Sequence, residues 1–297
     1  MSTISLFTDK PDPFDPDRLA QWRQAHTAPL DMGPYEAALL TLLHEVQTIP
    51  SWSRRSLDRL ARQHLGPEGA ARFTRDRLVQ AYQALVDAGR LEFDRETLKR
   101  LQRKPTRTIS GVAPVAVLTK PYACPGVCIF CPTDETMPKS YLRDEPGAQR
   151  AYLQQFDPFA QTAGRMAALE TIGHATDKIE LLILGGTWSA YPRSYQEAFI
   201  VRCLEAMNEQ PAVSLAEAQR MNESAPHRNV GLVIETRPDW ITPEEVVRLR
   251  RLGVTKVQLG IQSLDDSILA LNRRGHTVED PSEGGGINWK NDKFEEL

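Results

Sequence analysis

The sequence predicts an α/β fold, a partial (β/α) barrel with four strands that is preceded by a small all-helical domain. Two observations support this prediction. Apolar residues recur at helical spacing through residues 34–101, and four short apolar runs alternate with helical patterns from about residue 111 onward. Because strands that alternate with helices form parallel sheets, we expect the functional groups to gather where the strands end.

The chain divides into four predicted segments. Residues 1–33 are rich in Pro and Asp and predict an irregular arm, residues 34–103 a basic helical domain, residues 104–280 the partial barrel, and residues 281–297 a polar, glycine-rich tail that is disordered or aberrant. No apolar run approaches the length of a membrane span, and the amino terminus lacks a secretory pattern. We therefore expect a cytoplasmic protein with no membrane partner.

The basic helical domain is expected to contain three short helices. Pro34 can open the first, an apolar stripe over 57–65 indicates the second, and the third has Thr74 as its N-cap and ends at Gly89. Over residues 54–107 the net charge is +7. Such an excess of arginine favours binding to a phosphate backbone, although a solvated helical surface would carry the same charge.

The barrel segment is expected to hold four apolar, β-branched strands at 112–118, 178–184, 230–235 and 255–261. The long connection after the first strand predicts two helices, at about 144–155 and 158–172. A further helix precedes the last strand. It opens with a capping box from Thr242 to Glu245 and stops at Gly253.

Three cysteines follow the first strand with the spacing C-x3-C-x2-C, namely Cys124, Cys128 and Cys131. Three thiolates can hold three corners of a 4Fe-4S cluster and leave the fourth iron open, an arrangement typical of enzymes that cleave S-adenosylmethionine to form a carbon radical. A structural zinc site normally needs a fourth ligand, which the neighbouring sequence lacks, but zinc or inert buried cysteines remain alternatives. The lone Cys203 lies in an apolar stretch and is expected in the core.

Two further strand ends carry candidate cofactor-binding residues. Gly185, Gly186 and Thr187 place open backbone and a hydroxyl after the second strand, where they could accept from the ammonium group of S-adenosylmethionine. Gln262 and Ser263, after the fourth strand, offer hydrogen bonds to its ribose or carboxylate. The alternatives are a tight turn that needs glycine and loop polar groups with local partners.

Two motifs that contain arginine are open to either interpretation. Glu235 and Arg237 follow the third strand and could pair with each other or touch a ligand. Residues 273–276 hold two arginines and a histidine, which could reach a phosphate or substrate or form a solvated turn. Arginine suits both roles, because its planar guanidinium group binds anionic ligands and also forms structural ion pairs.

An ordered set of motifs around the cysteines resembles the radical S-adenosylmethionine part of the catalytic subunit of Elongator. It is more closely similar to the stand-alone prokaryotic relatives of that subunit, the tRNA uridine carboxymethyltransferases, whose compact cysteine spacing it shares. The resemblance covers about residues 100–280. The motifs are Lys104-Pro105-x-Arg107-Thr108-x-Ser110-Gly111, Pro138-Lys139-Ser140-Tyr141, Asp157-Pro158-Phe159-x-Gln161, Asp177-Lys178-Ile179-Glu180, Gly185-Gly186-Thr187, Glu235-Thr236-Arg237-Pro238-Asp239, Gly260-Ile261-Gln262-Ser263 and Asn272-Arg273-x-Gly275-His276-Thr277.

This resemblance implies a tRNA-modifying radical enzyme that acts as an acyltransferase. The three cysteines would hold the 4Fe-4S cluster, S-adenosylmethionine would bind to it, and Lys178 would contact the co-substrate acetyl-CoA, although a solvated strand edge also explains this lysine. A deoxyadenosyl radical would remove hydrogen from the acetyl methyl group, and the carbon radical would add to carbon 5 of the wobble uridine. Thioester hydrolysis would leave a carboxymethyl group.

The implied partners follow from the same resemblance. Residues 34–103 would bind the anticodon stem-loop of tRNA through its phosphates, and a reductant protein would supply the electron; no DNA partner is expected. The family continues with further strands and an acetyltransferase-like domain, so we expect a truncated chain that is incomplete for the whole reaction. A radical enzyme similar to porphyrinogen oxidases and a non-enzymatic RNA-binding fragment remain alternative functions.

Overall fold

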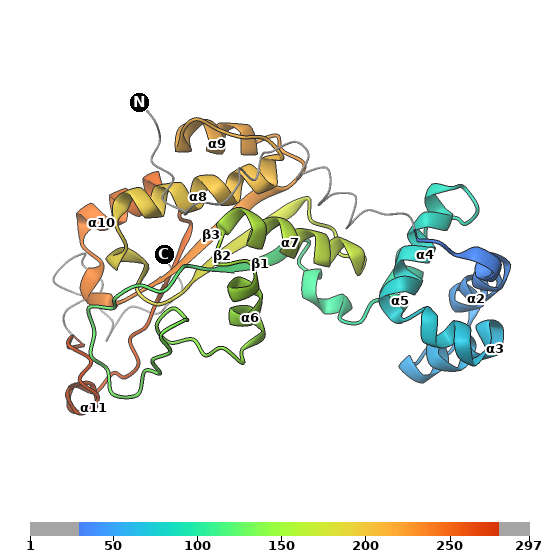
Figure 1. Cartoon of the computed structure of the whole chain (residues 1–297), viewed down its shortest axis with the longest axis horizontal. Helices are drawn as coiled ribbons and strands as arrows, with labels where there is room; N and C mark the ends of the chain where they lie inside the picture. Colours follow the sequence, from blue (N-terminus) through green and yellow to red (C-terminus); the bar gives the residue numbers. More distant parts are fainter. Residues whose placement is uncertain (1–29, 279–297) are drawn as a thin grey trace. The chain divides into compact units, whose positions relative to one another are not determined.

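The computed structural model describes residues 30–278 (Figure 1). Residues 1–29 of the predicted arm and the whole predicted tail, 281–297, lie outside the described residues. Among the described residues, no helix has the length and apolar character that crossing a membrane requires. This part of the chain forms two compact units, which comprise residues 30–113 with 166–176 and residues 114–165 with 177–278.

The first unit is helical and packs one apolar core. Its elements are the 3-10 turn η1 (Gly33–Tyr35), the helices α2 (Glu36–Thr48), α3 (Arg54–Arg72), α4 (Arg75–Asp87) and α5 (Arg95–Leu101), and the 3-10 turn η2 (Pro105–Thr108). Leu39, Leu42, Leu43 and Val46, whose spacing predicted the first helix, are buried in a cluster with apolar residues of the other helices. The predicted all-helical part of the fold is therefore confirmed.

The helix α3 extends further than its apolar stripe because the chain resumes a helical path after a break. Gly66 interrupts α3 with a φ of 69° and a ψ of 177°, and Pro67 follows. Glycine adopts this backbone conformation without the steric cost of a side chain. Proline lacks an N–H group and suits the first position of the next helical turn.

A fourth helix, α5, is present where the sequence predicted three. The carboxylate of Asp94 caps it by accepting from the backbone N–H groups of Glu96 at 3.2 Å and Thr97 at 2.9 Å. With 7 residues, α5 is too short to show helical periodicity, so its cap is its main signal. Thr74, by contrast, occupies the N-cap of α4 but its side chain makes no capping hydrogen bond there.

The second unit carries a four-stranded sheet in the order β1-β2-β3-β4. The strands are β1 (Ala113–Leu118), β2 (Lys178–Leu184), β3 (Arg228–Thr236) and β4 (Lys256–Leu259). β2 pairs with β3, and β3 with β4, in parallel, so their carboxyl ends share one edge of the sheet. Each strand overlaps its predicted range, and the predicted α/β class is confirmed.

Helices connect the strands and cover the sheet (Figure 1). They are α6 (Pro146–Leu153), α7 (Pro158–Thr171), α8 (Arg193–Asn208), α9 (Leu215–Asn222), α10 (Pro243–Arg251) and α11 (Asp266–Leu271), with 3-10 turns η3 (Trp188–Ala190) and η4 (Pro238–Trp240). α8 contacts β3, and α9 lies against α8. The capping box of α10 is confirmed, since Thr242 Oγ1 accepts from Glu245 N at 3.2 Å.

The burial of the strands explains why the functional groups converge at one edge. Ile179, Leu181 and Ile183 alternate along β2 and are buried, while Leu232, Val233 and Ile234 form a continuous buried run in β3. A continuous apolar run is typical of a parallel strand that is covered on both faces. The middle of β3 is therefore apolar, and the polar groups of the cavity lie near the carboxyl ends of the strands.

Candidate functional site

The loops that leave β1 and β2 are tied together at the carboxyl edge of the sheet. Thr119 N donates to Leu184 O at 2.9 Å, so the two strands end side by side. Thr119 Oγ1 lies 3.3 Å from Gly185 O and 2.8 Å from the hydroxyl of Tyr191. A Cβ atom on Gly185, whose φ is 131°, would lie 2.0 Å from Thr119 Oγ1. Only glycine fits at this position.

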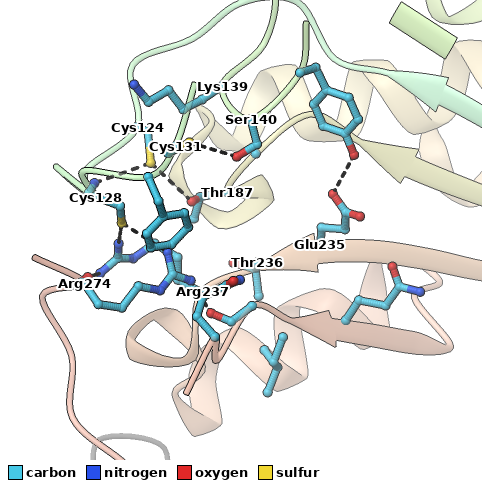
Figure 2. Close-up of a pocket in the computed structure, with 18 residues that line it drawn as sticks. Cys124, Cys128, Cys131, Lys139, Ser140, Thr187, Glu235, Thr236, Arg237 and Arg274 are labelled. Carbon is cyan, nitrogen blue, oxygen red and sulfur yellow. Dashed lines mark hydrogen bonds between the residues drawn. The ribbon is translucent and has the colours of Figure 1, made fainter. Parts of the chain in front are cut away.

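A cavity of about 410 Å³ opens at this edge (Figure 2). Loops that follow β1, β2, β3 and β4 all contribute to its wall, as the strand-end rule predicted. Six predicted site residues line it: Cys124, Cys128, Cys131, Gly186, Thr187 and Gln262.

The remaining three predicted site residues lie elsewhere. Gly185 sits behind the cavity wall, with its carbonyl accepting from Thr119 and Tyr191. Ser263 lines an adjoining cavity of about 180 Å³. Lys178 is the first residue of β2, at the end of that strand remote from the cysteines, and it is exposed. Its proposed contact with acetyl-CoA stays a prediction.

Two of the cysteine sulfurs have hydroxyl neighbours (Figure 2). Cys124 Sγ lies 3.6 Å from Thr187 Oγ1 and 3.4 Å from the donating N–H group of Gly126. Cys131 Sγ lies 3.1 Å from Ser140 Oγ. Such donors stabilise thiolate sulfur when it ligates a metal, and they orient the ligands.

The third sulfur, that of Cys128, faces two guanidinium groups. Arg274 Nη1 lies 3.3 Å from it and Arg237 Nη1 lies 4.0 Å from it. Both arginines are buried, with exposed fractions of 8% and 5%. Asp239 binds Arg237 through two hydrogen bonds of 2.8 and 2.9 Å. Burial lowers the pKa of Arg237, but Asp239 outweighs this effect and leaves that pKa raised, so the group stays charged.

A half-buried acid, Glu235, lies in another part of the wall, away from the cysteines (Figure 2). Tyr141 donates to Glu235 Oε2 at 3.1 Å. Burial raises the pKa of Glu235, and the hydrogen bond from Tyr141 only partly offsets this rise. Burial and the nearby carboxylate raise the pKa of Tyr141 in turn. The bonding partners of Glu235 and Arg237 are thus Tyr141 and Asp239, and the pairing that the sequence allowed between them is not the arrangement found.

The donor set fits an iron-sulfur cluster better than a single metal ion. Within residues 30–278, no three His, Cys, Asp or Glu side chains are grouped closely enough to ligate one ion. A zinc ion needs its sulfurs at about 2.3 Å from one centre, whereas a four-iron cube holds thiolates at separate corners. Three thiols spaced around one cavity, each with its own donor, suit the second arrangement.

The fourth cysteine is part of the core. Cys203 is fully buried in α8. Burial raises the pKa of its thiol to about 12, so it remains protonated at neutral pH. The expectation that Cys203 fills the core agrees with this environment.

Several further cavity residues stand outside the nine predicted site residues. They are Lys139, Ser140, Tyr141, Arg237 and Arg274. The sequence left Arg237 and the segment 273–276 open between a ligand contact and a local role, and the structure places Arg237 and Arg274 in the cavity wall. Residues 138–141 stood out only through the family motif.

Comparison with known proteins identifies the family. The sequence profile of the Radical SAM superfamily matches residues 119–284, more than half of the chain. The tRNA uridine(34) acetyltransferase of Methanocaldococcus infernus is 53% identical over 186 residues, which cover 61% of this chain and 35% of that protein. The protein of the same name from Dehalococcoides mccartyi is 48% identical over 181 residues, which cover 61% of this chain and 39% of that protein.

A more distant relative and a solved structure also match part of the chain. Elongator complex protein 3 of Schizosaccharomyces pombe is 36% identical over 193 residues, which cover 61% of this chain and 36% of that protein. The structure of the archaeal Methanocaldococcus infernus Elp3 with an N-terminus deletion (1-46) is 44% identical, covers 59% of this chain and 34% of that one, and has a TM-score of 0.48. The chain spans somewhat over a third of the length of these curated relatives. The chain is similar in sequence to stand-alone prokaryotic proteins of the Elongator type, and it belongs to the radical SAM superfamily.

Proposed function

We propose that this chain carries the radical-forming site of an enzyme that carboxymethylates carbon 5 of the wobble uridine in tRNA, with acetyl-CoA as the source of carbon. The observation that carries the proposal is the convergence of three thiols, their hydroxyl neighbours and two buried arginines on one cavity at the strand ends. The names of the similar prokaryotic proteins support tRNA uridine as the substrate.

The cavity residues have two proposed roles: some would hold the cluster, and others would bind and orient S-adenosylmethionine. The three cysteines would hold a 4Fe-4S cluster, which supplies a 5′-deoxyadenosyl radical when S-adenosylmethionine is also bound. Gly186 and Thr187 offer backbone and hydroxyl acceptors for an ammonium group, and Gln262 offers an amide to a ribose or carboxylate. Tyr141 and Glu235 are held by each other, so this wall is ordered before a ligand enters.

The helical unit supplies a surface suited to the phosphates of tRNA. Arg55, Arg59 and Arg62 recur on one face of α3 and are all exposed. Within residues 30–278, none of these three arginines has a carboxylate within ion-pairing distance. Unpaired guanidinium groups in a row are free to bind successive phosphates.

Three further parts of the proposal rest on the family resemblance. Lys178 would contact acetyl-CoA, a reductant protein would deliver electrons, and the protein would act in the cytoplasm.

The test is anaerobic reconstitution followed by an assay of 5′-deoxyadenosine. We expect the full chain to take up about four iron and four sulfide ions and its iron spectrum to respond to S-adenosylmethionine. Release of 5′-deoxyadenosine should fall when tRNA or acetyl-CoA is omitted in turn. Uptake of zinc in place of iron and sulfide, or a spectrum that ignores S-adenosylmethionine, would overturn the proposal.

Two cysteine variants make this assay specific. Cys128→Ala should abolish both the cluster and 5′-deoxyadenosine, because it removes one of three ligands, while tRNA binding is retained. Cys203→Ala is the matched control, since this thiol is buried in α8 and faces no cluster ligand, and it should keep the cluster. Loss of tRNA affinity in Cys128→Ala would show that the cysteines are structural.

A further inference from the structure

We infer that Arg237 and Arg274 act together as a fixed positive charge that raises the reduction potential of the cluster from its Cys128 corner. They are positioning and tuning residues for the redox step. The inference rests on the proposed function, because it needs a cluster on the three cysteines.

The environment of the three sulfurs is unequal. Cys124 and Cys131 have neutral hydroxyl neighbours, from Thr187 and Ser140, at 3.6 and 3.1 Å. Cys128 has two guanidinium groups instead, at 3.3 and 4.0 Å. The positive field of the two guanidinium groups would therefore be strongest at the Cys128 corner of the cluster.

The charge next to Cys128 is only partly compensated. Among residues 30–278, Asp239 is the carboxylate that ion-pairs with these arginines, and it binds Arg237. His276 lies nearby, but burial and the neighbouring Arg274 lower its pKa, so it stays neutral at pH 7. Lys139 also lines the cavity, and its ammonium group donates to Thr133. Two guanidinium groups against one carboxylate leave about one net positive charge beside the sulfur.

Arg274 also holds a hydrogen-bond donor that the protein itself does not use. Its Nε atom is buried and, within the described residues, has no hydrogen-bond partner. An unsatisfied buried donor on a charged group is unfavourable, because it has lost its hydrogen bonds to water. Arg274 lines the cavity, so its charge would stabilise a negatively charged group there, such as thiolate-bound iron and sulfide.

The backbone is shaped to let both guanidinium groups reach this position. A Cβ atom on Gly126 would lie 2.2 Å from Arg237 Nη1, and one on Gly260 would lie 3.0 Å from Arg274 Nη2. Arg274 donates to Gly260 O, and Arg237 Nη2 donates to Arg274 O at 2.8 Å. The arginines are therefore held before any cluster is present, and their charge needs no reorganisation.

Electrostatics sets the direction of the effect. When one electron from an external reductant enters, the cluster with its thiolates becomes more negative by one unit. A fixed positive charge in a buried site stabilises the more negative, reduced form. The two arginines should therefore make the cluster easier to reduce, and removal of their charge should make it harder.

The test is a redox titration of the reconstituted full chain with dithionite, in the absence of S-adenosylmethionine and tRNA. Electron paramagnetic resonance measures the reduced fraction of the cluster at each potential. In Arg274→Gln we expect the ratio of reduced to oxidised cluster at a fixed potential to fall at least tenfold, which corresponds to 59 mV for one electron. Arg274→Lys keeps the positive charge, so the change in its midpoint potential should be less than half of the change in Arg274→Gln. Arg273→Gln, the same charge change at the exposed neighbouring residue, should stay within twofold of the unmodified chain.

Asp239→Asn provides an independent variant with the opposite sign. It removes the compensating carboxylate, so the reduced fraction at fixed potential should rise, and this measurement decides the matter if Arg274→Gln assembles no cluster. Equal midpoint potentials for Arg274→Gln and Arg273→Gln would overturn this inference but not the proposed function. A reduced fraction that fails to rise in Asp239→Asn would do the same. A chain that takes up no iron and sulfide would overturn the proposed function instead.

Discussion

Tyr141 donates to Glu235 at 3.1 Å and so joins the loop after the cysteines to the end of β3, 94 residues further along the chain. The pair closes one wall of the cavity with a carboxyl group that is half-buried. Burial raises the pKa of Glu235 above its ordinary value. Ionisation of this group therefore opposes folding at neutral pH, and a stability measurement can detect it.

Replacement of Glu235 by glutamine should stabilise the protein at neutral pH. In the unfolded chain the carboxyl group has its ordinary pKa near 4.5, whereas in the folded chain its pKa is higher. Between these values the folded state holds more protons, so stability falls as pH rises and the loss persists above the folded pKa. We expect the free energy of unfolding of Glu235→Gln to exceed that of the unmodified chain at pH 7 and to match it near pH 4.

Tyr141→Phe tests the cause of this effect. It removes the hydrogen bond that lowers the pKa of Glu235, so the loss of stability with rising pH should extend to a higher pH. Urea unfolding across pH 4 to 8 measures both variants. A gain in Glu235→Gln that is the same at every pH would point to packing and not to ionisation.

Gly185→Ala should destabilise the second unit strongly. The new Cβ atom would meet Thr119 Oγ1 at 2.0 Å, on a backbone with a φ of 131°. Steric overlap and backbone strain together should cost about 3 kcal/mol in the free energy of unfolding. Gly186→Ala is the control, because its nearest contact would be Lys139 O at 3.4 Å, and it should cost about 1 kcal/mol. Equal losses in the two variants would contradict the role of the Thr119 contact.

Asp94→Ala should weaken the helical unit by about 1 kcal/mol, because it removes the N-cap of α5. Hydrogen bonds from the side chain and backbone of Thr97 lower the pKa of Asp94. Its stabilising effect is therefore present at neutral pH and is lost as pH falls through the folded pKa. Urea unfolding should show the largest difference from the unmodified chain at pH 7. Asp94→Asn retains a capping oxygen, and a loss as large as that of the alanine variant would exclude capping as the cause.

Replacement of Arg55, Arg59 and Arg62 by glutamine should weaken tRNA binding and its dependence on salt. Each guanidinium that contacts a phosphate releases a counterion, so the slope of log K against log salt should decrease by up to about 3. Filter binding or fluorescence anisotropy over a range of salt concentrations measures this slope.

The matched control removes the same charge from residues that already have partners. Arg72, Arg90 and Lys99 each form an ion pair with an acidic side chain of the same unit. Their triple glutamine variant should change the slope less than the α3 variant does. If both triple variants lowered the slope equally, binding would follow total charge and not the row of arginines on α3.

Much of the fold could be predicted from the sequence because its signals are local. The capping box at Thr242 and the apolar run of β2 each depend on a few neighbouring residues. The spacing of Cys124, Cys128 and Cys131 likewise places three thiols on one short loop, and the cavity contains all three. The helix α5 was missed because it is too short for a periodic pattern.

The sequence by itself determined the class of fold, the three cysteines proposed as cluster ligands and the edge of the sheet where they lie, since these follow from spacing and from strand order. Only the tertiary structure decided which groups surround each sulfur. Arg274 approaches Cys128 across 146 residues of sequence, and Tyr141 reaches Glu235 across 94. Neither contact has a local signal, because each depends on how separate loops meet at the edge of the sheet and on the glycines that leave room for a guanidinium group.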